Sequence, residues 1–517
     1  MHDAPHGGRP APEVPPPAPV RGGGISPLLA GALTFLASAC VLVLEIAAAR
    51  LLAPYVGVSL TTYTAIIGII LAGIAAGAWT GGRLADALPP EPMVGPAIAL
   101  GGIAAIASVP IVAMLGEGLS GGGAASSVLL AGVGFVLPAA ILSAAAPMLV
   151  RATIRDVATS GGLVGRLSAI GTVGALTGTF LTGFILLGLV PTRALVIGTG
   201  VILVLVGIVV AWRHRRGAAS AGTLLALVVS AGAMTGVAAA SPSPCERESA
   251  YYCIAVREDA GDPSRRTLVL DNLRHAFVDL DDPTAIEFAY IRWFREAASD
   301  VTTPRRGPMP TVEAVHIGGG GFAFPRYLRA VLPASQHVVL ELDPVVLEVA
   351  RAELGFVPDP FVEVRLGDAR GTLATVSDDA ADLVVGDAFG GLSVPWHLMT
   401  RELVADVDRV LRPGGRYVLN VIDGPSLLLV RAQVATLRER FEHVAVITWR
   451  EAFAGRGGGN AVIVASHLAF DAADLRERIE AGDPTATLIA GTEVESFAAT
   501  APVLTDDFAP ADQLIGR

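Results

Sequence analysis

The chain of 517 residues contains no lysine, so arginine carries every basic side-chain charge. Only 16% of its residues are charged, whereas 52% are hydrophobic. A chain this apolar is not disordered as a whole, and it presents no broad basic face to a nucleic acid. Its three cysteines and nine histidines show no metal-ligand spacing, and no serine, histidine and acid accompany a nucleophile turn. These absences argue against a nucleic-acid partner, a resident metal and a serine hydrolase.

The charges that are present divide unevenly along the chain. Residues 1–240 hold 11 arginines against 7 acids, a net charge of +4, and residues 241–517 hold 26 arginines against 41 acids, a net charge of −15. An acidic second half disfavours a phosphate-backbone partner and attracts small cations. We therefore expect an apolar first half joined to an acidic, soluble second half.

The first half contains seven apolar runs of the length that crosses a bilayer, which is roughly 20 residues in a helix. The runs are apolar on all sides, whereas buried helices of a soluble protein keep one polar face. We expect a multi-pass helical domain in the cell membrane over residues 26–240, with the lipid bilayer as its partner. Residues 1–25, rich in proline and glycine, are expected to form a disordered tail. The runs cover about 27–48, 62–82, 95–115, 127–149, 168–190, 194–212 and 221–240.

Small residues recur at helical spacing in these runs. Gly73, Gly77 and Gly81 lie four residues apart, and glycines so placed let helix backbones approach closely in lipid. The spans are therefore expected to pack as one bundle. Glu45 is an exception, because an ionisable group within a span is costly. It has either a functional role or a structural pairing with Arg50, and both readings stay open.

Arginine distribution predicts the orientation of the spans. Seven crossings would place the tail in the cytoplasm and the second half outside. Cys245 and Cys253, eight residues apart, would suit a disulfide in an oxidising compartment, although spacing alone does not decide this. The loops opposite the tail hold Arg50 and Arg193, and the tail side holds Arg9, Arg21, Arg83, Arg151, Arg155, Arg166, Arg213, Arg215 and Arg216.

From about residue 311, short apolar strands alternate with helical stretches, which indicates a parallel sheet in an α/β fold. The first strand, Val312–Ile317, runs into four glycines, Gly318–Gly321. Gly318 and Gly320 are candidates for a turn that approaches a bound nucleoside. Glu341 ends the second strand, 23 residues after Gly318, where a carboxylate can accept both hydroxyls of a ribose.

Two further strands also end in acids. Asp368 and Ala369 follow the third strand, where an adenine amino group could be read, and Asp387 follows the fourth. A Pro-Gly-Gly turn at 413–415 then leads into a fifth strand. Acids at one edge of a parallel sheet, followed by such a turn, are typical of a class I methyltransferase-like Rossmann domain, which we expect over residues 311–517.

The second half resembles the spermidine synthase family of polyamine aminopropyltransferases over about residues 249–467, and the preceding apolar half resembles its membrane-fused members. Segments 249–256 and 266–271 are similar to the family's N-terminal β-hairpins, so residues 241–310 are expected to form a small β subdomain. The nucleoside-binding motifs of the family resemble Gly318–Gly321, Glu341–Pro344 and Asp368-Ala369. Segments 387–398 and 504–507 are similar to the membrane-fused branch.

The resemblance implies transfer of an aminopropyl group from decarboxylated S-adenosylmethionine to a small cationic amine such as putrescine. Asp387 would be the catalytic base, and the donor would be a co-substrate rather than a permanently bound cofactor. The substrate candidates are His275, Tyr290 and Asp506, although His275 stands where the family has a glutamine. Gly321 and Gly390 stand where the family has acids, so this chain lacks some of the groups that bind the diamine in the family.

Two other functions remain open. One is an S-adenosylmethionine-dependent methyltransferase acting on a cationic or membrane-associated acceptor. The other is a non-catalytic transport or sensor protein that binds a polyamine or nucleoside, because a domain outside the membrane would be separated from a cytosolic donor. The sequence also leaves open whether the chain forms a homo-oligomer.

Overall fold

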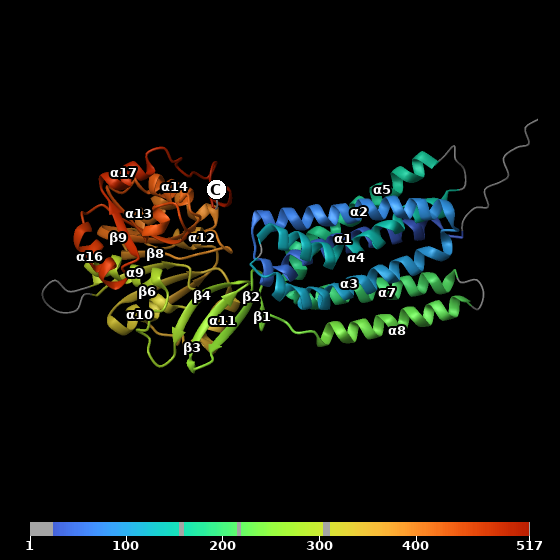
Figure 1. Ribbon diagram of the computed structural model, residues 1–517, viewed down its shortest axis with the longest axis horizontal. Coiled ribbons are helices and arrows are strands. Elements are labelled where there is room, and N and C mark those ends of the chain that lie inside the picture. The colour runs from blue at the N-terminus through green and yellow to red at the C-terminus, as the bar shows by residue number, and fades with distance from the viewer. Residues whose placement is uncertain (1–23, 122, 155–159, 215–218, 303–310, 516–517) are drawn as a thin grey trace, which may run out of the picture.

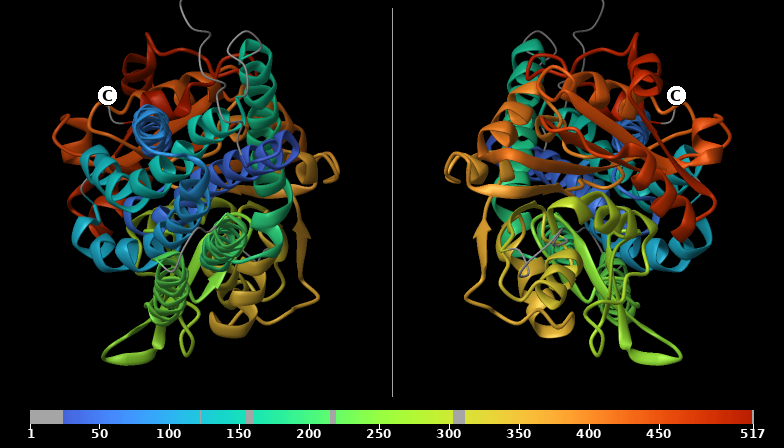
Figure 2. Two further views of the ribbon diagram at one scale, coloured as in Figure 1. Left: turned by 90° about the vertical axis from the view of Figure 1, so that its right-hand side faces the viewer. Right: turned by 90° about the vertical axis from the view of Figure 1, so that its left-hand side faces the viewer.

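The protein divides into a long helical half and an α/β half that follow one another along the molecule's long axis (Figure 1). The computed structural model describes residues 24–121, 123–154, 160–214, 219–302 and 311–515. The tail expected over residues 1–25 therefore lies almost wholly outside the described residues. Figure 2 looks along the long axis and shows the helices of the first half nearly end-on.

Within the described residues, seven helices are long and apolar enough to cross a membrane, and they correspond to the seven expected runs. Ser26 and Ser59 cap the first two, because each side chain accepts a hydrogen bond from a backbone N–H of the first turn. The helices are α1 (Pro27–Val56), α2 (Leu60–Ala87), α3 (Glu91–Leu119), α4 (Gly123–Thr153), α5 (Ser160–Leu181) continued by η2 (Thr182–Leu186) and α6 (Leu187–Leu189), α7 (Thr192–Arg213) and α8 (Ala219–Ala240).

Glycines set the distances between the long helices. Gly77 of α2 lies so close to α4 that a Cβ atom there would overlap the carbonyl group of Ala140. Gly73 and Gly81 continue the same contact one turn to either side. Helices that pack through such a stripe gain van der Waals contact along their backbones. The expected close packing of the spans is thus confirmed for α2 and α4.

An arginine joins the two halves, and a disulfide closes the connection that follows the last long helix. Cys245 and Cys253 form a disulfide that ties the connection after α8 to strand β2 (Cys253–Asp259). The guanidinium of Arg50, near the end of α1, donates hydrogen bonds to the carbonyl oxygens of Ser249 and Tyr251. A pairing of Arg50 with Glu45 is therefore wrong, since both terminal nitrogens of Arg50 bind the second half instead.

A small antiparallel sheet opens the α/β half and confirms the expected β-hairpins. Its strands follow the order β1-β2-β3-β4. Apolar side chains of this sheet pack against Phe322 and Phe356, whose rings are stacked 4.1 Å apart between centroids. The strands are β1 (Arg247–Glu248), β2 (Cys253–Asp259), β3 (Asp262–Leu270) and β4 (Leu273–Asp279).

The large sheet has eight strands in the order β12-β10-β11-β9-β8-β5-β6-β7. Its first five strands in the chain pair in parallel, and the last three are antiparallel. This is the expected methyltransferase-like Rossmann arrangement. The strands are β5 (Glu313–Ile317), β6 (Gln336–Glu341), β7 (Val362–Leu366), β8 (Ala381–Gly386), β9 (Leu411–Asp423), β10 (His443–Trp449), β11 (Gly459–Ser466) and β12 (Ala486–Ala490).

Helices cover both faces of this sheet. One core includes apolar residues of α12, α13, α14 and α17, and a second includes residues of α9, α10 and α16. The helices of this half are α9 (Ala289–Thr302), α10 (Ala323–Val331), α11 (Pro344–Glu353), α12 (Ala369–Leu373), η3 (Trp396–Leu398), α13 (Arg401–Val410), α14 (Leu428–Leu437), α15 (Arg450–Phe453), α16 (Ala472–Gly482), α17 (Thr492–Ala498) and α18 (Ala511–Leu514).

Two local features differ from expectation. Helix α9, which a boundary at residue 310 assigns to the small β subdomain, instead buries Trp293 and Phe294 in the core of the large sheet. The Pro-Gly-Gly segment is not a separate turn before a strand. It forms a bulge within β9, because Leu411 pairs with Ala381 and Arg416 already pairs with Leu383.

The glycine stripe gives a direct test of the helix packing. Gly77→Ala should destabilise the protein by about 1–3 kcal/mol, because the added methyl group forces α2 and α4 apart. Gly68→Ala on the same helix is the matched control, since a Cβ there has no atom within 4 Å. Thermal unfolding of the detergent-solubilised chain measures both. Equal melting temperatures for the two variants would contradict this packing.

Candidate functional site

Two adjoining cavities open where the parallel strands of the large sheet end. The first, of about 250 Å³, is the aromatic cavity, and the second, of about 260 Å³, is the acidic cavity. Asp387, Gly318 and Gly320 belong to both walls, so the cavities meet at the tips of β5 and β8. The aromatic cavity is lined in part by Phe288, Tyr290, Phe294, Phe324, Phe389 and Trp449, and the acidic cavity by Asp271, Glu341, Asp368 and Asp387.

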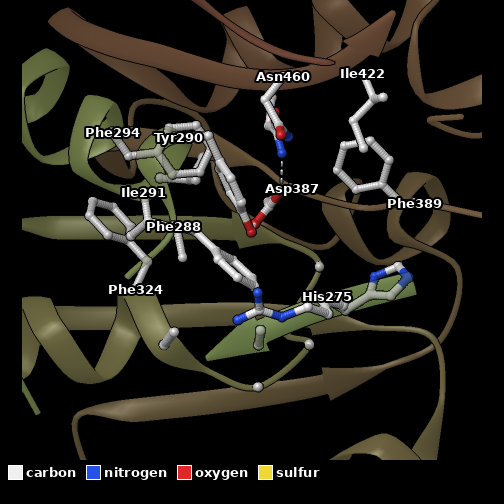
Figure 3. Close-up of a pocket in the computed structure, with 18 of the residues that line it drawn as sticks. His275, Phe288, Tyr290, Ile291, Phe294, Phe324, Asp387, Phe389, Ile422 and Asn460 are labelled. Atoms are coloured by element: carbon white, nitrogen blue, oxygen red, sulfur yellow. Dashed lines mark hydrogen bonds between the residues drawn. The ribbon is translucent and has the colours of Figure 1, made fainter. Parts of the chain in front are cut away.

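Asp387 directly follows β8 and is held by two polar neighbours, of which Figure 3 labels Tyr290. Asn420 donates its side-chain N–H to Oδ1 over 2.9 Å, and the Tyr290 hydroxyl donates to Oδ2 over 3.2 Å. Asn460 in turn donates to the Oδ1 atom of Asn420 over 3.0 Å. Burial raises the pKa of Asp387 to about 6, although both hydrogen bonds oppose the rise. The group is therefore an oriented carboxylate that can exchange a proton near neutral pH.

The glycine turn after β5 fits tightly beside Asp387. Gly318 has a φ of 97°, a left-handed conformation that favours glycine. A Cβ atom at Gly318 would also overlap the backbone carbonyl of Asp387. At Gly320, where φ is 47°, a Cβ would meet no atom within 4 Å, so this side of the turn is open. The turn thus lies at the boundary of the two cavities, and the N–H of Gly318 donates to the carbonyl oxygen of Leu340 over 2.9 Å.

Glu341, at the end of β6, supports that turn. Its Oε2 accepts hydrogen bonds from the N–H groups of Gly319 and Gly320 at 2.9 and 3.1 Å. Its Oε1 accepts from the N–H of Asp343 at 2.8 Å. Burial raises the pKa of Glu341, and these three hydrogen bonds lower it again in part. The side chain is 7% exposed within a wall of the acidic cavity.

Asp368 and Ala369 lie at the far end of the acidic cavity, where β7 gives way to α12. Asp368 caps that helix by accepting from the N–H of Arg370 at 2.9 Å. Its other oxygen is 2.9 Å from Nε2 of His397. His397 therefore fixes the direction in which the Asp368 carboxylate faces, while Ala369 leaves room beside it.

His275 and Tyr290 reach the site from outside the large sheet. His275, on β4, lies in the wall that both cavities share. Its Nε2 is shielded from solvent and has no hydrogen-bond partner among the described residues. Burial lowers the pKa of His275 to about 4, so the ring is neutral at pH 7. Tyr290, on α9, is joined to Asp387 as described above.

Asp506 does not lie in either cavity wall. Both of its oxygens bind the guanidinium of Arg370, at 2.7 and 2.8 Å, and one also accepts from the Thr400 hydroxyl at 2.7 Å. Its negative charge is thus balanced by Arg370 in a structural contact. The role of Asp506 in substrate binding stays a prediction, which this contact does not favour.

Three further site residues were not expected from the sequence. Asn420 and Asn460 orient Asp387, and a signal for Asn420 existed, since it interrupts the apolar strand 417–422. Val58, between α1 and α2, lies in the wall of the acidic cavity. A Cβ at Gly391, where φ is 86°, would lie 2.8 Å from the Val58 carbonyl oxygen. The helical half therefore supplies part of this wall, and its sequence carries no signal of that role.

Comparisons with known proteins agree with the fold. Residues 315–419 match a family model described as a methyltransferase domain. A polyamine aminopropyltransferase of Vibrio vulnificus is 34% identical over 113 residues, which cover 22% of this chain and 38% of that protein. An eEF1A lysine and N-terminal methyltransferase of Danio rerio is 32% identical over 127 residues, covering 23% and 18%. Both of these relatives are transferases, and the chain spans less than half of either.

Among solved structures, a probable spermidine synthase from Corynebacterium glutamicum is similar to this chain. It shares 27% sequence identity with a TM-score of 0.47, and the alignment covers 50% of this chain and 95% of that one.

The burial of Asp387 predicts a pH-dependent effect on stability. Because its pKa rises from 3.8 to about 6 on folding, the ionised side chain opposes folding above pH 6, and this cost is absent below about pH 4. Asp387→Asn should therefore raise stability at pH 8, by up to about 2–3 kcal/mol. The melting temperature, followed by tryptophan fluorescence, should differ little from that of the unmodified protein at pH 4. An equal gain at both pH values would contradict the buried charge.

Proposed function

We propose that the protein is a multi-pass membrane transferase that moves an aminopropyl group from decarboxylated S-adenosylmethionine to an amine. The observation that carries the proposal is a single oriented carboxylate, Asp387, at the boundary of an acidic and an aromatic cavity. The acidic cavity would hold the donor and the aromatic cavity the acceptor. The similarity to aminopropyltransferases and to the methyltransferase domain supports a donor of the S-adenosylmethionine type.

The acidic cavity supplies suitable groups for such a donor. Glu341 would accept the ribose hydroxyls, Asp368 would accept the adenine amino group, and Ala369 would leave space for the ring. The turn at Gly318 and Gly320 would pass close to the sulfonium end. A positively charged donor is favoured by the four acids that line this cavity.

The charge of the cavity also favours the decarboxylated donor over S-adenosylmethionine itself. The described lining of the acidic cavity includes no arginine, and the chain has no lysine. His275, with its pKa lowered to about 4, supplies no positive charge at pH 7 either. Arg50, which lies outside this lining, interacts with Asp271. An additional donor carboxylate would therefore meet four acids and no arginine of the described cavity wall, which is unfavourable away from water.

Asp387 would act on the amine. An alkylammonium has a pKa near ~10 and is not a nucleophile until it loses a proton. The Asp387 carboxylate would hold the ammonium and accept that proton, with Tyr290 and Asn420 fixing its two oxygens. The nitrogen lone pair then attacks the aminopropyl carbon bound to sulfur. The C–S bond breaks, its electron pair stays on sulfur, and methylthioadenosine leaves as a neutral thioether. Alignment of amine, carbon and sulfur supplies most of the rate.

Release of methylthioadenosine by the purified full-length chain tests the proposal. With decarboxylated S-adenosylmethionine and a panel of primary amines, Asp387→Asn should lower kcat by at least about 100-fold, since it removes the base. The rate should fall as pH drops through about 6, where Asp387 becomes protonated. Asp506→Asn, outside both cavities, should retain activity.

The contrary outcomes of this assay are distinct. No methylthioadenosine with any amine would exclude aminopropyl transfer. Calorimetry with both donors then separates the alternatives, because a methyltransferase would bind S-adenosylmethionine at least as tightly as its decarboxylated form.

A second candidate is a membrane sensor or transport protein in which the α/β half binds a nucleoside or polyamine without catalysis. The Cys245–Cys253 disulfide favours it, because disulfides persist in oxidising compartments whereas the donor pool is cytosolic. The start of α1 also lies at the end of the bundle far from the α/β half (Figure 1). With the tail in the cytoplasm, that half would face outside.

Membrane sidedness separates the two candidates. A reporter that is active only outside the cytoplasm, fused after residue 517, should be silent if the protein is the proposed transferase. A matched fusion of the same reporter after the second described helix, α2, should give the opposite signal, because α2 ends on the side of the bundle away from the α/β half. Activity of the C-terminal fusion would favour the binding protein over the enzyme.

A further inference from the structure

We propose that the acceptor is a primary amine with one ammonium group and an apolar or aromatic body, rather than a diamine. The inference rests on the proposed aminopropyl transfer and specifies its second substrate. It is carried by the charges and the side chains that line the aromatic cavity.

The aromatic cavity holds a single acid. Among the described residues that line it, Asp387 is the only aspartate or glutamate. A diamine bound there would place one ammonium on Asp387 and the other where no carboxylate is available. An ammonium removed from water without a paired charge is strongly unfavourable. One carboxylate therefore selects one ammonium.

The other charge in the cavity wall has the wrong sign for a second ammonium. Arg274 belongs to the lining, and its guanidinium forms an ion pair with Glu287. The same guanidinium lies over the Phe288 ring, 5.1 Å from its centroid. The ring face that could hold a cation is thus already covered by Arg274. The Glu287 carboxylate is paired with Arg274 and lies outside the described lining, so this wall offers a second ammonium no carboxylate of its own.

Aromatic rings make up much of the remaining wall. Figure 3 shows Phe288, Phe294 and Phe324 gathered on one side of Asp387, with Phe389 and Ile422 on the other. Edge-to-face contacts fix this group: Phe294 lies 5.5 Å from Tyr290 and 5.6 Å from Phe324 between ring centroids. Phe294 and Phe324 are themselves buried, so they hold the group in place, and the accessible apolar surface comes from the half-buried Phe288, Phe389 and Ile422. Burying apolar area contributes about 25 cal/mol per Å². The cavity therefore suits a hydrocarbon or aromatic tail attached to the reacting amine.

An amine panel tests the inference on the full-length chain in lipid nanodiscs with decarboxylated S-adenosylmethionine. Methylthioadenosine release is compared for pentylamine and phenethylamine against putrescine and cadaverine. We expect kcat/KM for the monoamines to exceed that for the diamines by at least about tenfold. Higher kcat/KM with the diamines would overturn this inference and leave the proposed transfer standing. No release with any amine would overturn the proposed transfer and the inference with it.

A variant pair tests the physical cause. Ile422→Asp adds a second carboxylate to the cavity wall, and Ile422→Asn changes the side chain to the same size without the charge. We expect the aspartate variant to raise the ratio of cadaverine to pentylamine turnover at least about tenfold over the asparagine variant. Equal ratios in two folded variants, as judged by melting temperature, would overturn the charge argument. If either variant fails to fold, the ranking in the unmodified protein decides.

Discussion

The site depends on one close approach between two backbone segments. The glycine turn after β5 passes so near the backbone of Asp387 that no side chain fits at Gly318. Asp387 lies at this contact between the tips of β5 and β8, and burial raises its pKa. The same turn is anchored by Glu341 through two N–H groups, so the glycine turn and the two acids form one unit.

The ionised carboxylate of Asp387 is unfavourable where it is buried, and hydrogen bonds from neighbouring side chains offset part of that cost. Among the described residues, the Asp387 carboxylate accepts side-chain hydrogen bonds from Asn420 and Tyr290. An incoming cation would supply the charge that it lacks, and a buried carboxylate gains more from such a partner than an exposed one. Without a bound cation, the ionised Asp387 therefore lowers the stability of the folded protein. Strain of this kind is typical of sites that bind and release a charged ligand.

Much of the fold could be predicted from the sequence, since it follows from local rules. The seven long helices follow from apolar runs of membrane-spanning length, and the contact of α2 with α4 follows from glycines four residues apart. The strand ends that carry Glu341, Asp368 and Asp387 could be located because parallel strands place their carboxyl ends at one edge. The location of these acids near one another follows from topology alone.

The features that sequence reasoning missed depend on contacts between distant segments. The sequence does not distinguish Asp506 from the acids that line the cavity, because its ion pair with Arg370 is seen only in the structure. Helix α9 follows the small sheet in the chain, yet the core that buries Trp293 belongs to the large one. The bulge in β9 arises because four residues, 412–415, stand opposite a single residue of β8. In each case the deciding partner lies far away in sequence or in a neighbouring strand.

The position of Val58 has a consequence for how the chain matures. One wall of the acidic cavity comes from the connection between the first two helices, and the facing Gly391 comes from a segment synthesised much later. The complete cavity exists only after both halves have folded and docked through Arg50. An unassembled chain would have an open, hydrated cleft in which acids repel one another and a ligand is poorly enclosed. Without the connection between the first two helices, the acidic cavity would lack the part of its wall that Val58 supplies.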